Sequence, residues 1–201
     1  MLFFIQRCWE YVFPERSDHK SVRLAANEDL LRLVCPTDFG EFVALLDFKE
    51  PLVRATVHEA KFKGNEKAWL MLAKVLESYL KHLPRGTVVI PIPLSAKRAR
   101  KRGYDQVYEV AKRAMRTLPH LKLDTHIIRR RWDTVPQTSL SRADRLKNVQ
   151  GAFIASDTSI ISDVRLVLLD DVVTTGATLR AARAELARHR PASVTLLSLA
   201  H

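Results

Sequence analysis

The chain has 201 residues, 47% of them hydrophobic, and a formal net charge of +11, so it can bury the core of one ordinary domain with a small appendage. Cys8 and Cys35 stand alone in the sequence, which argues against a zinc module or a disulfide framework and weakly indicates a reducing compartment. No run approaches about 18 apolar residues and no basic segment precedes the apolar N-terminus, so we expect neither a membrane span nor a signal peptide and predict a cytoplasmic protein.

The first part of the chain is predicted to be mainly helical. Residues 1–45 have mixed composition and weak periodicity, apart from a short helix expected from about Asn27. From Pro51 the apolar pattern is that of a helix, which Gly64 interrupts. A second amphipathic helix is expected over residues 66–83.

The rest of the chain alternates strands and helices. Apolar or β-branched runs predict strands over residues 87–95, 126–132, 164–171 and 193–200, and amphipathic patterns predict helices over residues 105–118, 141–149 and 176–190. This alternation is typical of right-handed βαβ units. It predicts an α/β fold with a parallel central sheet and helices on both faces, in which a helical lead-in (residues 50–83) precedes the core (residues 85–201).

One stretch, VLLDDVVTTGATL (residues 167–179), has the clearest chemical pattern. It puts Asp170 and Asp171 at the end of a predicted strand, and in open α/β sheets ligands bind beyond the carboxyl ends of the strands. The turn that follows offers backbone N–H groups at a helix N-terminus, hydroxyl groups and a glycine, which together suit a monophosphate. The two carboxylates suit a pair of vicinal hydroxyls, so the stretch predicts a ribose 5-phosphate site. The turn consists of Thr174, Thr175, Gly176, Ala177 and Thr178.

Simpler explanations account for parts of this stretch. Thr174 or Thr175 can cap the next helix while solvent surrounds the acids, although capping leaves most of the string unexplained.

Other motif classes are excluded by the sequence. A P-loop is rejected because no G-x-x-x-x-G-K-[ST] segment occurs, and the G-x-G-x-x-G fingerprint is also absent. The seven histidines show no H-x-H or H-E-x-x-H spacing, so we assign no metal-histidine or triad chemistry.

Several segments together resemble one protein family. VLLDDVVTTGATL is similar to the 5-phosphoribosyl-1-pyrophosphate (PRPP) signature of type I phosphoribosyltransferases. VIPIPLSAKRARKRGYDQ (89–106), QTSLSRADRLKNVQGAF (137–153) and the upstream VHEAKFKGNEKAWLMLAKVL (57–76) resemble successive blocks of the ComF branch. The likeness extends over residues 46–201 and implies a type I phosphoribosyltransferase fold. Residues 1–45 would then be a degenerate zinc-finger or hood segment, and because the finger's cysteines are missing we expect no zinc.

The resemblance also implies roles for individual residues. Asp170 and Asp171 would hold the ribose hydroxyls and Arg102 would meet the pyrophosphate charge, which makes these three the catalytic residues. Residues 174–178 would hold the 5-phosphate. The other substrate contacts would be Leu94, Ser95, Ala96 and Arg98 around a pyrophosphate loop, and Gln137, Arg142 and Arg145 in a loop over residues 130–148 that closes on the substrate. Mg²⁺ would come with PRPP near the two acids, held by substrate and water rather than by direct protein ligation.

The reaction implied by this resemblance is transfer of the 5-phosphoribosyl group. Pyrophosphate leaves the anomeric carbon through an oxocarbenium-like transition state, which needs charge stabilisation and exclusion of water more than a general base. The sequence does not indicate the acceptor or whether catalysis is retained. ComF relatives are tied to DNA uptake, so the uptake machinery is a further candidate partner. A homodimer is a separate candidate.

The basic middle of the chain supports a rival hypothesis. Between Ser95 and Asn148 there are 15 Lys and Arg but only 5 Asp and Glu, and such a stretch attracts polyanions unless it is merely a solvated face. In this hypothesis the chain is an inactive phosphoribosyltransferase-fold module. It would bind single-stranded nucleic acid through residues 95–148, or it would bind a DNA-uptake partner. Its stacking platforms would be Tyr104, Tyr108 and Trp132, which core packing also explains. We rank PRPP binding first, transfer second and nucleic-acid binding third.

Overall fold

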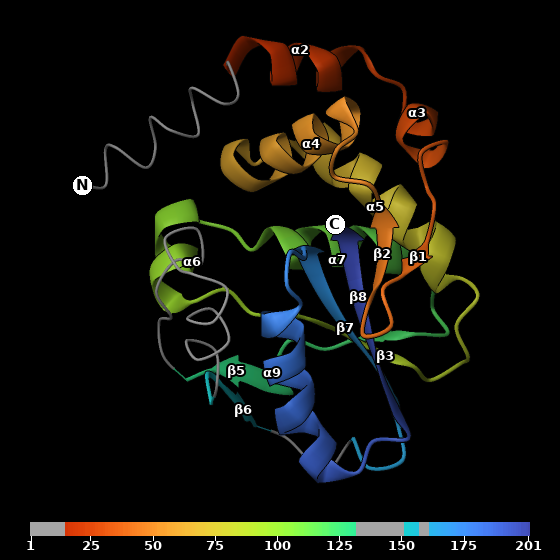
Figure 1. Cartoon of the computed structure of the whole chain (residues 1–201), viewed down its shortest axis with the longest axis vertical. Coiled ribbons are helices and arrows are strands. Elements are labelled where there is room, and N and C mark those ends of the chain that lie inside the picture. Colours follow the sequence, from red (N-terminus) through yellow and green to blue (C-terminus); the bar gives the residue numbers. More distant parts are fainter. Residues whose placement is uncertain (1–14, 132–150, 157–160) are drawn as a thin grey trace.

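The computed structural model describes residues 15–131, 151–156 and 161–201 (Figure 1). The α-helices in these ranges are α2 (Glu15–Leu24), α3 (Asn27–Leu31), α4 (Pro51–His58), α5 (Glu66–Leu80), α6 (Ala96–Arg102), α7 (Gln106–Ala114) and α9 (Ala177–Leu186). A π-helix, η1 (Glu59–Lys63), continues α4, and the 3₁₀ turns η2 (Met115–Thr117) and η4 (Ala187–His189) follow α7 and α9. The strands are β1 (Thr37–Asp38), β2 (Val43–Leu46), β3 (Val88–Pro91), β4 (Lys122–Leu123), β5 (Ile128–Arg130), β6 (Phe153–Ala155), β7 (Arg165–Val172) and β8 (Ser193–Ala200).

Within the described ranges, six strands form the main sheet in the order β1-β2-β8-β7-β3-β4. The neighbours from β2 to β4 are parallel, and the short edge strand β1 is antiparallel to β2. In the middle of the sheet, Leu169 of β7 lies opposite Leu197 of β8 and Pro91 of β3. The prediction of an α/β fold with a parallel central sheet is confirmed.

One predicted strand forms outside the main sheet. Residues 126–132 are predicted as a strand, and β5 forms there, but it pairs antiparallel with β6 in a separate two-stranded sheet. The strand beside β3 is instead β4, which runs parallel to it. Because β4 consists of Lys122 and Leu123 alone, it has no apolar run from which sequence periodicity could identify it.

β7 is buried on both faces because its apolar run is continuous. Val167 and Leu169 belong to the core formed with α5 and α7, whereas Leu166 and Leu168 belong to the core formed with α9. Each of these four side chains is at most 1% exposed. Burying one such side chain contributes about 1.5–3 kcal/mol, so the apolar run fixes β7 at the centre of the sheet.

The connections from β3 and β7 run in opposite directions across the sheet. From β3 the chain passes through α7 to β4, and from β7 it passes through α9 to β8. The carboxyl ends of β3 and β7 therefore flank a topological switch point. In α/β sheets this is where the loops separate and leave a crevice for a ligand.

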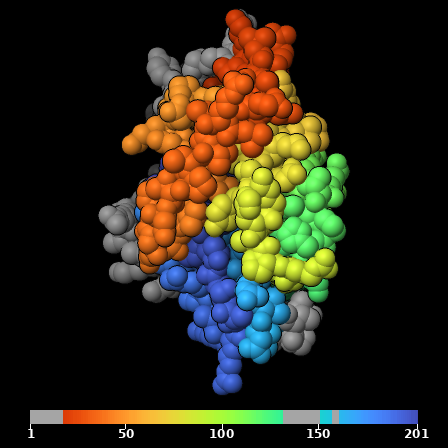
Figure 2. Space-filling view, turned by 90° about the vertical axis from the view of Figure 1, so that its right-hand side faces the viewer, coloured from red at the N-terminus to blue at the C-terminus, as the bar shows by residue number. Residues whose placement is uncertain are grey.

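The segment before β3 joins the same sheet and the same core. β2 pairs parallel with β8, so a boundary drawn after residue 45 falls inside a strand of the main sheet. Leu30 of α3 is fully buried in the core that α5 and α7 share. In Figure 2 the orange surface around residues 35–50 lies directly against the blue surface of the C-terminal elements. The N-terminal part of the described chain therefore contributes to the edge of the candidate site.

Candidate functional site

Asp170 and Asp171 lie at the carboxyl end of β7, beside the switch point. Successive side chains of a strand point to opposite faces. Asp171 therefore continues the row of Val167 and Leu169 toward α7, and Asp170 continues the opposite row toward α9. The two neighbouring acids have different surroundings for this reason.

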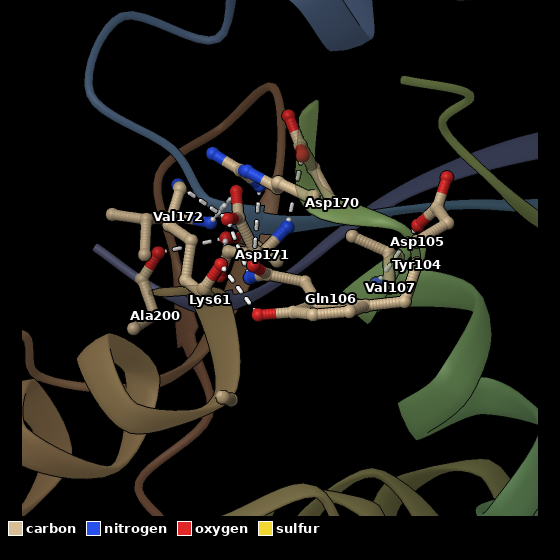
Figure 3. Close-up of polar contacts among 12 residues, drawn as sticks. Lys61, Tyr104, Asp105, Gln106, Val107, Asp170, Asp171, Val172 and Ala200 are labelled. Atoms are coloured by element: carbon tan, nitrogen blue, oxygen red, sulfur yellow. Dashed lines mark hydrogen bonds and ion pairs between the residues drawn. The ribbon is translucent and has the colours of Figure 1, made fainter. Parts of the chain in front are cut away.

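Asp171 is held by three hydrogen-bond donors of the protein itself (Figure 3). Its Oδ2 accepts from Lys61 Nζ at 2.5 Å and from Gln106 Nε2 at 2.6 Å, and its Oδ1 accepts from the Val172 N–H at 2.7 Å. The Asp171 side chain is only 13% exposed. Lys61 and Gln106 are 110 and 65 residues away in sequence, and sequence reasoning missed both because no local pattern links them to the acid pair.

The two carboxyl groups differ in protonation. Burial and the charge of Asp171 raise the pKa of Asp170 to about 7, while a hydrogen bond from the Asp171 N–H at 2.9 Å opposes the shift. Burial alone would raise the pKa of Asp171 too, but the Lys61 ammonium, the Val172 N–H and the Arg102 charge together lower it. Of the two acids, Asp171 is therefore the one whose surroundings favour the charged form, and Asp170 is the one whose surroundings oppose it.

Residues 174–178 form a turn that leads into the N-terminus of α9. Gly176 has a left-handed conformation, with φ at 70°, and α9 begins directly after it. The Thr175 Oγ1 accepts from the Ala177 N–H at 3.5 Å, and Thr174 is exposed. α9 has 10 residues, so its N-terminus carries the partial positive charge of the helix dipole. This charge favours an anion beside the turn.

A pocket of about 250 Å³ opens beside this turn. The Phe39 ring stacks on Phe42 with 5.1 Å between centroids, and the His201 ring meets both edge-on at 4.3 and 5.3 Å. Arg180 Nη1 of α9 forms an ion pair with Glu41 Oε2 at 2.5 Å. The pocket is lined by Phe39, Glu41, Phe42, Thr174, Thr175, Arg180 and His201. Sequence reasoning missed it because one wall comes from the weakly patterned residues 1–45.

The segment predicted as a pyrophosphate loop forms the start of α6. Ser95 caps this helix by accepting the Arg98 N–H at 3.4 Å, and it is 3% exposed. The Leu94 N–H donates to Asp105 Oδ2 at 3.3 Å, so this donor is already bonded within the protein. Ala96 and Arg98 lie in the first turn of α6, beyond the carboxyl end of β3.

Arg102, at the end of α6, turns toward the acid pair. Its Nη1 donates to Gln106 Oε1 at 3.5 Å, and its guanidinium lies 5.4 Å from the centroid of the Phe62 ring. Burial lowers the pKa of Arg102, and the charge of Asp171 opposes this shift. Through Gln106, Arg102 is connected to Asp171 on the β3 side of β7.

Some predicted site residues lie outside the described ranges, namely Gln137, Arg142, Arg145 and the stacking candidate Trp132. Of the other stacking candidates, Tyr104 packs edge-on against Trp69 at 5.2 Å between centroids, and Lys112 lies 5.8 Å from the Tyr108 ring. Residues 15–131, 151–156 and 161–201 contain no group of three His, Cys, Asp or Glu side chains that could hold a metal ion. No helix in those ranges combines the length and apolar character needed to cross a membrane.

Comparison with known proteins shows which proteins this chain is similar to. The sequence model described as phosphoribosyl transferase domain matches residues 74–201. Competence protein F of Haemophilus influenzae is 32% identical over 150 residues, which cover 70% of this chain and 64% of that protein, just under two thirds of its length. DNA utilization protein YhgH of Escherichia coli is 27% identical over 82% of this chain and 73% of that protein. Among solved structures, a hypoxanthine phosphoribosyltransferase of Staphylococcus aureus aligns with a TM-score of 0.42 and 16% identity, covering 65% of this chain and 61% of that one.

Proposed function

We propose that this chain, which belongs to the phosphoribosyl transferase domain family, binds PRPP at the carboxyl end of β7 and transfers its 5-phosphoribosyl group with release of pyrophosphate. One observation carries the proposal. The acid pair Asp170 and Asp171 ends β7, and the N-terminus of α9 begins just after Gly176 at the same switch point. Acceptors for vicinal hydroxyls thus lie next to a cradle for a monophosphate.

In this proposal the two acids have different tasks. Asp170 accepts the ribose hydroxyls, because its carboxyl group takes one backbone hydrogen bond whereas the oxygens of Asp171 already take three internal ones. The 5-phosphate binds the N–H groups of residues 174–178. Arg98 and Arg102 meet the pyrophosphate from α6, which presents its cations beside the carboxyl end of β3.

Mg²⁺ enters the site with PRPP in this proposal. The donors fit this ion, because it prefers hard oxygen ligands and the carboxylate of Asp170 would lie beside the oxygen atoms of bound PRPP. When bound, the ion neutralises charge that develops on the leaving pyrophosphate. The chain's own residues hold the ribose and the 5-phosphate, and the arginines of α6 stabilise the departing charge as the anomeric C–O bond breaks.

The acceptor is proposed to enter the pocket beside the turn. The rings of Phe39, Phe42 and His201 form flat walls that suit a planar group. Glu41 and Arg180 supply charged groups at the same pocket. A volume of about 250 Å³ lies below the usual range for drug-sized ligands, so it suits a single ring system better than a second nucleotide.

A titration with PRPP and Mg²⁺ tests the proposal directly. Calorimetry should give saturable binding with one ligand per chain, and ribose 5-phosphate should compete for the site. A screen of nucleobases and amines for pyrophosphate release then identifies the acceptor. If millimolar PRPP with Mg²⁺ gives no heat and no competition, the proposed function is wrong.

A nucleic-acid role is the second candidate. The relatives include proteins named for competence and DNA utilization, so we propose a cytoplasmic role connected with DNA uptake. α6 has the sequence AKRARKR and contributes no buried residue, so in this candidate role its Lys and Arg side chains contact the phosphates of a single strand. If the strand binds there, its log affinity should fall with log salt by about 0.7 per phosphate contact. Absence of binding at low salt would exclude this role.

A further inference from the structure

We propose that Lys61 is a positioning residue of the PRPP site: it fixes Asp171 as the inward-turned acid and thereby leaves Asp170 to meet the ribose. This inference rests on the proposed function and deepens it. Lys61 lies before residue 74, where the family match begins. If Lys61 has this role, the π-helix η1 of the helical lead-in contributes to the site although it lies outside the residues of the family match.

The contacts of Lys61 define its task. Its Nζ lies 2.5 Å from Asp171 Oδ2, the oxygen that also accepts from Gln106 at 2.6 Å. These two donors use both lone pairs of that oxygen, and the Val172 N–H occupies the other oxygen. The Lys61 and Asp171 side chains are 26% and 13% exposed, so the pair is partly shielded from water and its geometry is well defined.

The main chain around Lys61 is shaped to present this side chain. α4 widens into the π-helix η1, and such segments within helices frequently occur at functional sites. The carbonyl of Ala60 accepts from Trp69 Nε1, and the carbonyl of Lys61 accepts from the Tyr104 hydroxyl, both at 3.2 Å. Two aromatic side chains from other elements therefore hold the backbone at the point from which Lys61 extends.

Gly64 is part of the same arrangement. It ends η1 with a left-handed conformation, at φ 62°, and a Cβ at this position would lie 3.0 Å from Tyr104 Cε1. Glycine thus allows the Tyr104 ring to approach closely enough to bond to the Lys61 carbonyl. The ring is further fixed by its edge contact with Trp69 at 5.2 Å. The Lys61–Asp171 contact is therefore specified by several residues and is not a chance meeting of a long side chain with an acid.

The physical consequence concerns both acids. Without the ammonium of Lys61, the Asp171 carboxylate would be a partly buried charge beside Asp170 with one donor fewer. The Asp171 side chain would reorient or take up a proton. Asp170 would then share the hydrogen-bonding partners of Asp171. Because PRPP brings further negative charge to this point, loss of Lys61 should weaken PRPP binding.

Calorimetric titration with PRPP and Mg²⁺ compares three variants. Lys61→Met removes the charge but keeps an apolar stem, and it should weaken binding about 10- to 100-fold. Lys61→Arg keeps a cation and should recover most of this loss. Lys63→Met changes an exposed lysine of the same π-helix and should leave the affinity unchanged. If Lys61→Met does not fold, Lys61→Gln, which keeps a short donor, takes its place.

The Asp171→Asn background distinguishes positioning from direct contact with the ligand. If Lys61 acts through Asp171, Lys61→Met should cause little further loss of PRPP affinity or thermal stability in that background. An equal loss of affinity in both backgrounds would mean that Lys61 binds the ligand itself, and the proposal would be wrong. Unchanged affinity in Lys61→Met overturns this proposal alone. Absence of binding to the unaltered protein overturns the proposed function first, and this inference falls with it.

Discussion

The two sides of the β7 end differ in how far the protein satisfies its own polar groups. On the face of the sheet that packs against α7, Asp171 accepts hydrogen bonds from Lys61 and Gln106 at 2.5 and 2.6 Å. On the face that packs against α9, the turn before this helix lines a pocket of about 250 Å³, where the charged groups are those of the Glu41–Arg180 pair. The first side is already organised without a ligand, and the second offers a ligand space beside the N-terminus of α9.

This difference separates two adjacent and chemically identical residues. Asp170 and Asp171 follow each other in the PRPP-like string, yet the pleat of β7 directs them to opposite sides. In the proposed function, the string therefore indicates the class of ligand, whereas contacts with Lys61 and Gln106 decide which acid is left to bind it. Preorganisation of this kind makes a site precise, because the frame does not have to move when the ligand arrives.

The largest expected effect is a split between binding and stability. Asp170→Asn removes the ligand-facing charge, and it should lower PRPP affinity about 100-fold without lowering the melting temperature. Asp171→Asn removes the partner of Lys61, and it should destabilise the fold by about 1–2 kcal/mol, or roughly 2–8 °C. Calorimetric titration and scanning calorimetry on both variants measure the two effects.

One result would contradict this predicted difference between Asp170→Asn and Asp171→Asn. If both variants lose affinity equally and neither changes the melting temperature, the two acids share the ligand in the same way. The division between an organised side and an open side would then be wrong. A double variant, Asp170→Asn with Asp171→Asn, should lose PRPP binding altogether while remaining folded.

A second prediction concerns the turn on the open side. Gly176 and Gly86 both have positive φ, at 70° and 82°, so alanine at either position should cost about 1–2 kcal/mol of stability. A Cβ on Gly176 would lie 3.1 Å from Arg180 Nη1 and 3.4 Å from Phe42 Cδ1, whereas one on Gly86 would meet open space. Gly176→Ala should therefore also lower PRPP affinity, by about 10-fold, and Gly86→Ala should not.

Denaturant unfolding and PRPP titration separate the two contributions in these glycine variants. Equal affinities of the two variants would contradict the prediction. A Cβ on Gly176 would then not disturb PRPP, and the turn would not be the phosphate cradle that its position at the N-terminus of α9 indicates.

The sequence predicts those parts of the fold and of the candidate site that depend on residues close together in the chain. The buried run of β7 and the turn at Gly176 follow from local patterns, so residues 164–190 are predicted closely. The two-residue strand β4 and the hairpin of β1 and β2 have too few periodic positions to be recognised. The Lys61–Asp171 pair joins residues 110 positions apart, and only the tertiary fold brings them together.

A third prediction uses the pH dependence of stability. The pKa of Asp170 is raised to about 7 in the folded protein, against about 3.9 in an unfolded chain. Between these values the folded state binds a proton that the unfolded state does not, so the Asp170 contribution to stability falls as pH rises from about 4 to 7. Asp170→Asn should remove this slope and be more stable than the unaltered protein at pH 8 by about 1 kcal/mol or more.

Urea unfolding at several pH values between 5 and 8 tests this prediction. The unaltered protein should lose stability relative to Asp170→Asn as the pH rises, and the gap should stop growing above about pH 7. Parallel curves for the two proteins would show that Asp170 is charged in the folded state throughout this range. The contrast between the two acids would then lie in their hydrogen bonds alone.

The smallest expected effect concerns the ion pair at the pocket. Arg180 and Glu41 have side chains 28% and 49% exposed, so Glu41→Gln should change stability by less than about 1 kcal/mol. It should nevertheless raise PRPP affinity about 2- to 5-fold, because it frees Arg180 for an anion at the neighbouring turn. Arg188→Gln breaks the pair with Glu185 farther along the same helix and should change neither quantity. If Glu41→Gln weakens binding instead, the pair holds the pocket wall in place, and the open side is also organised before the ligand arrives.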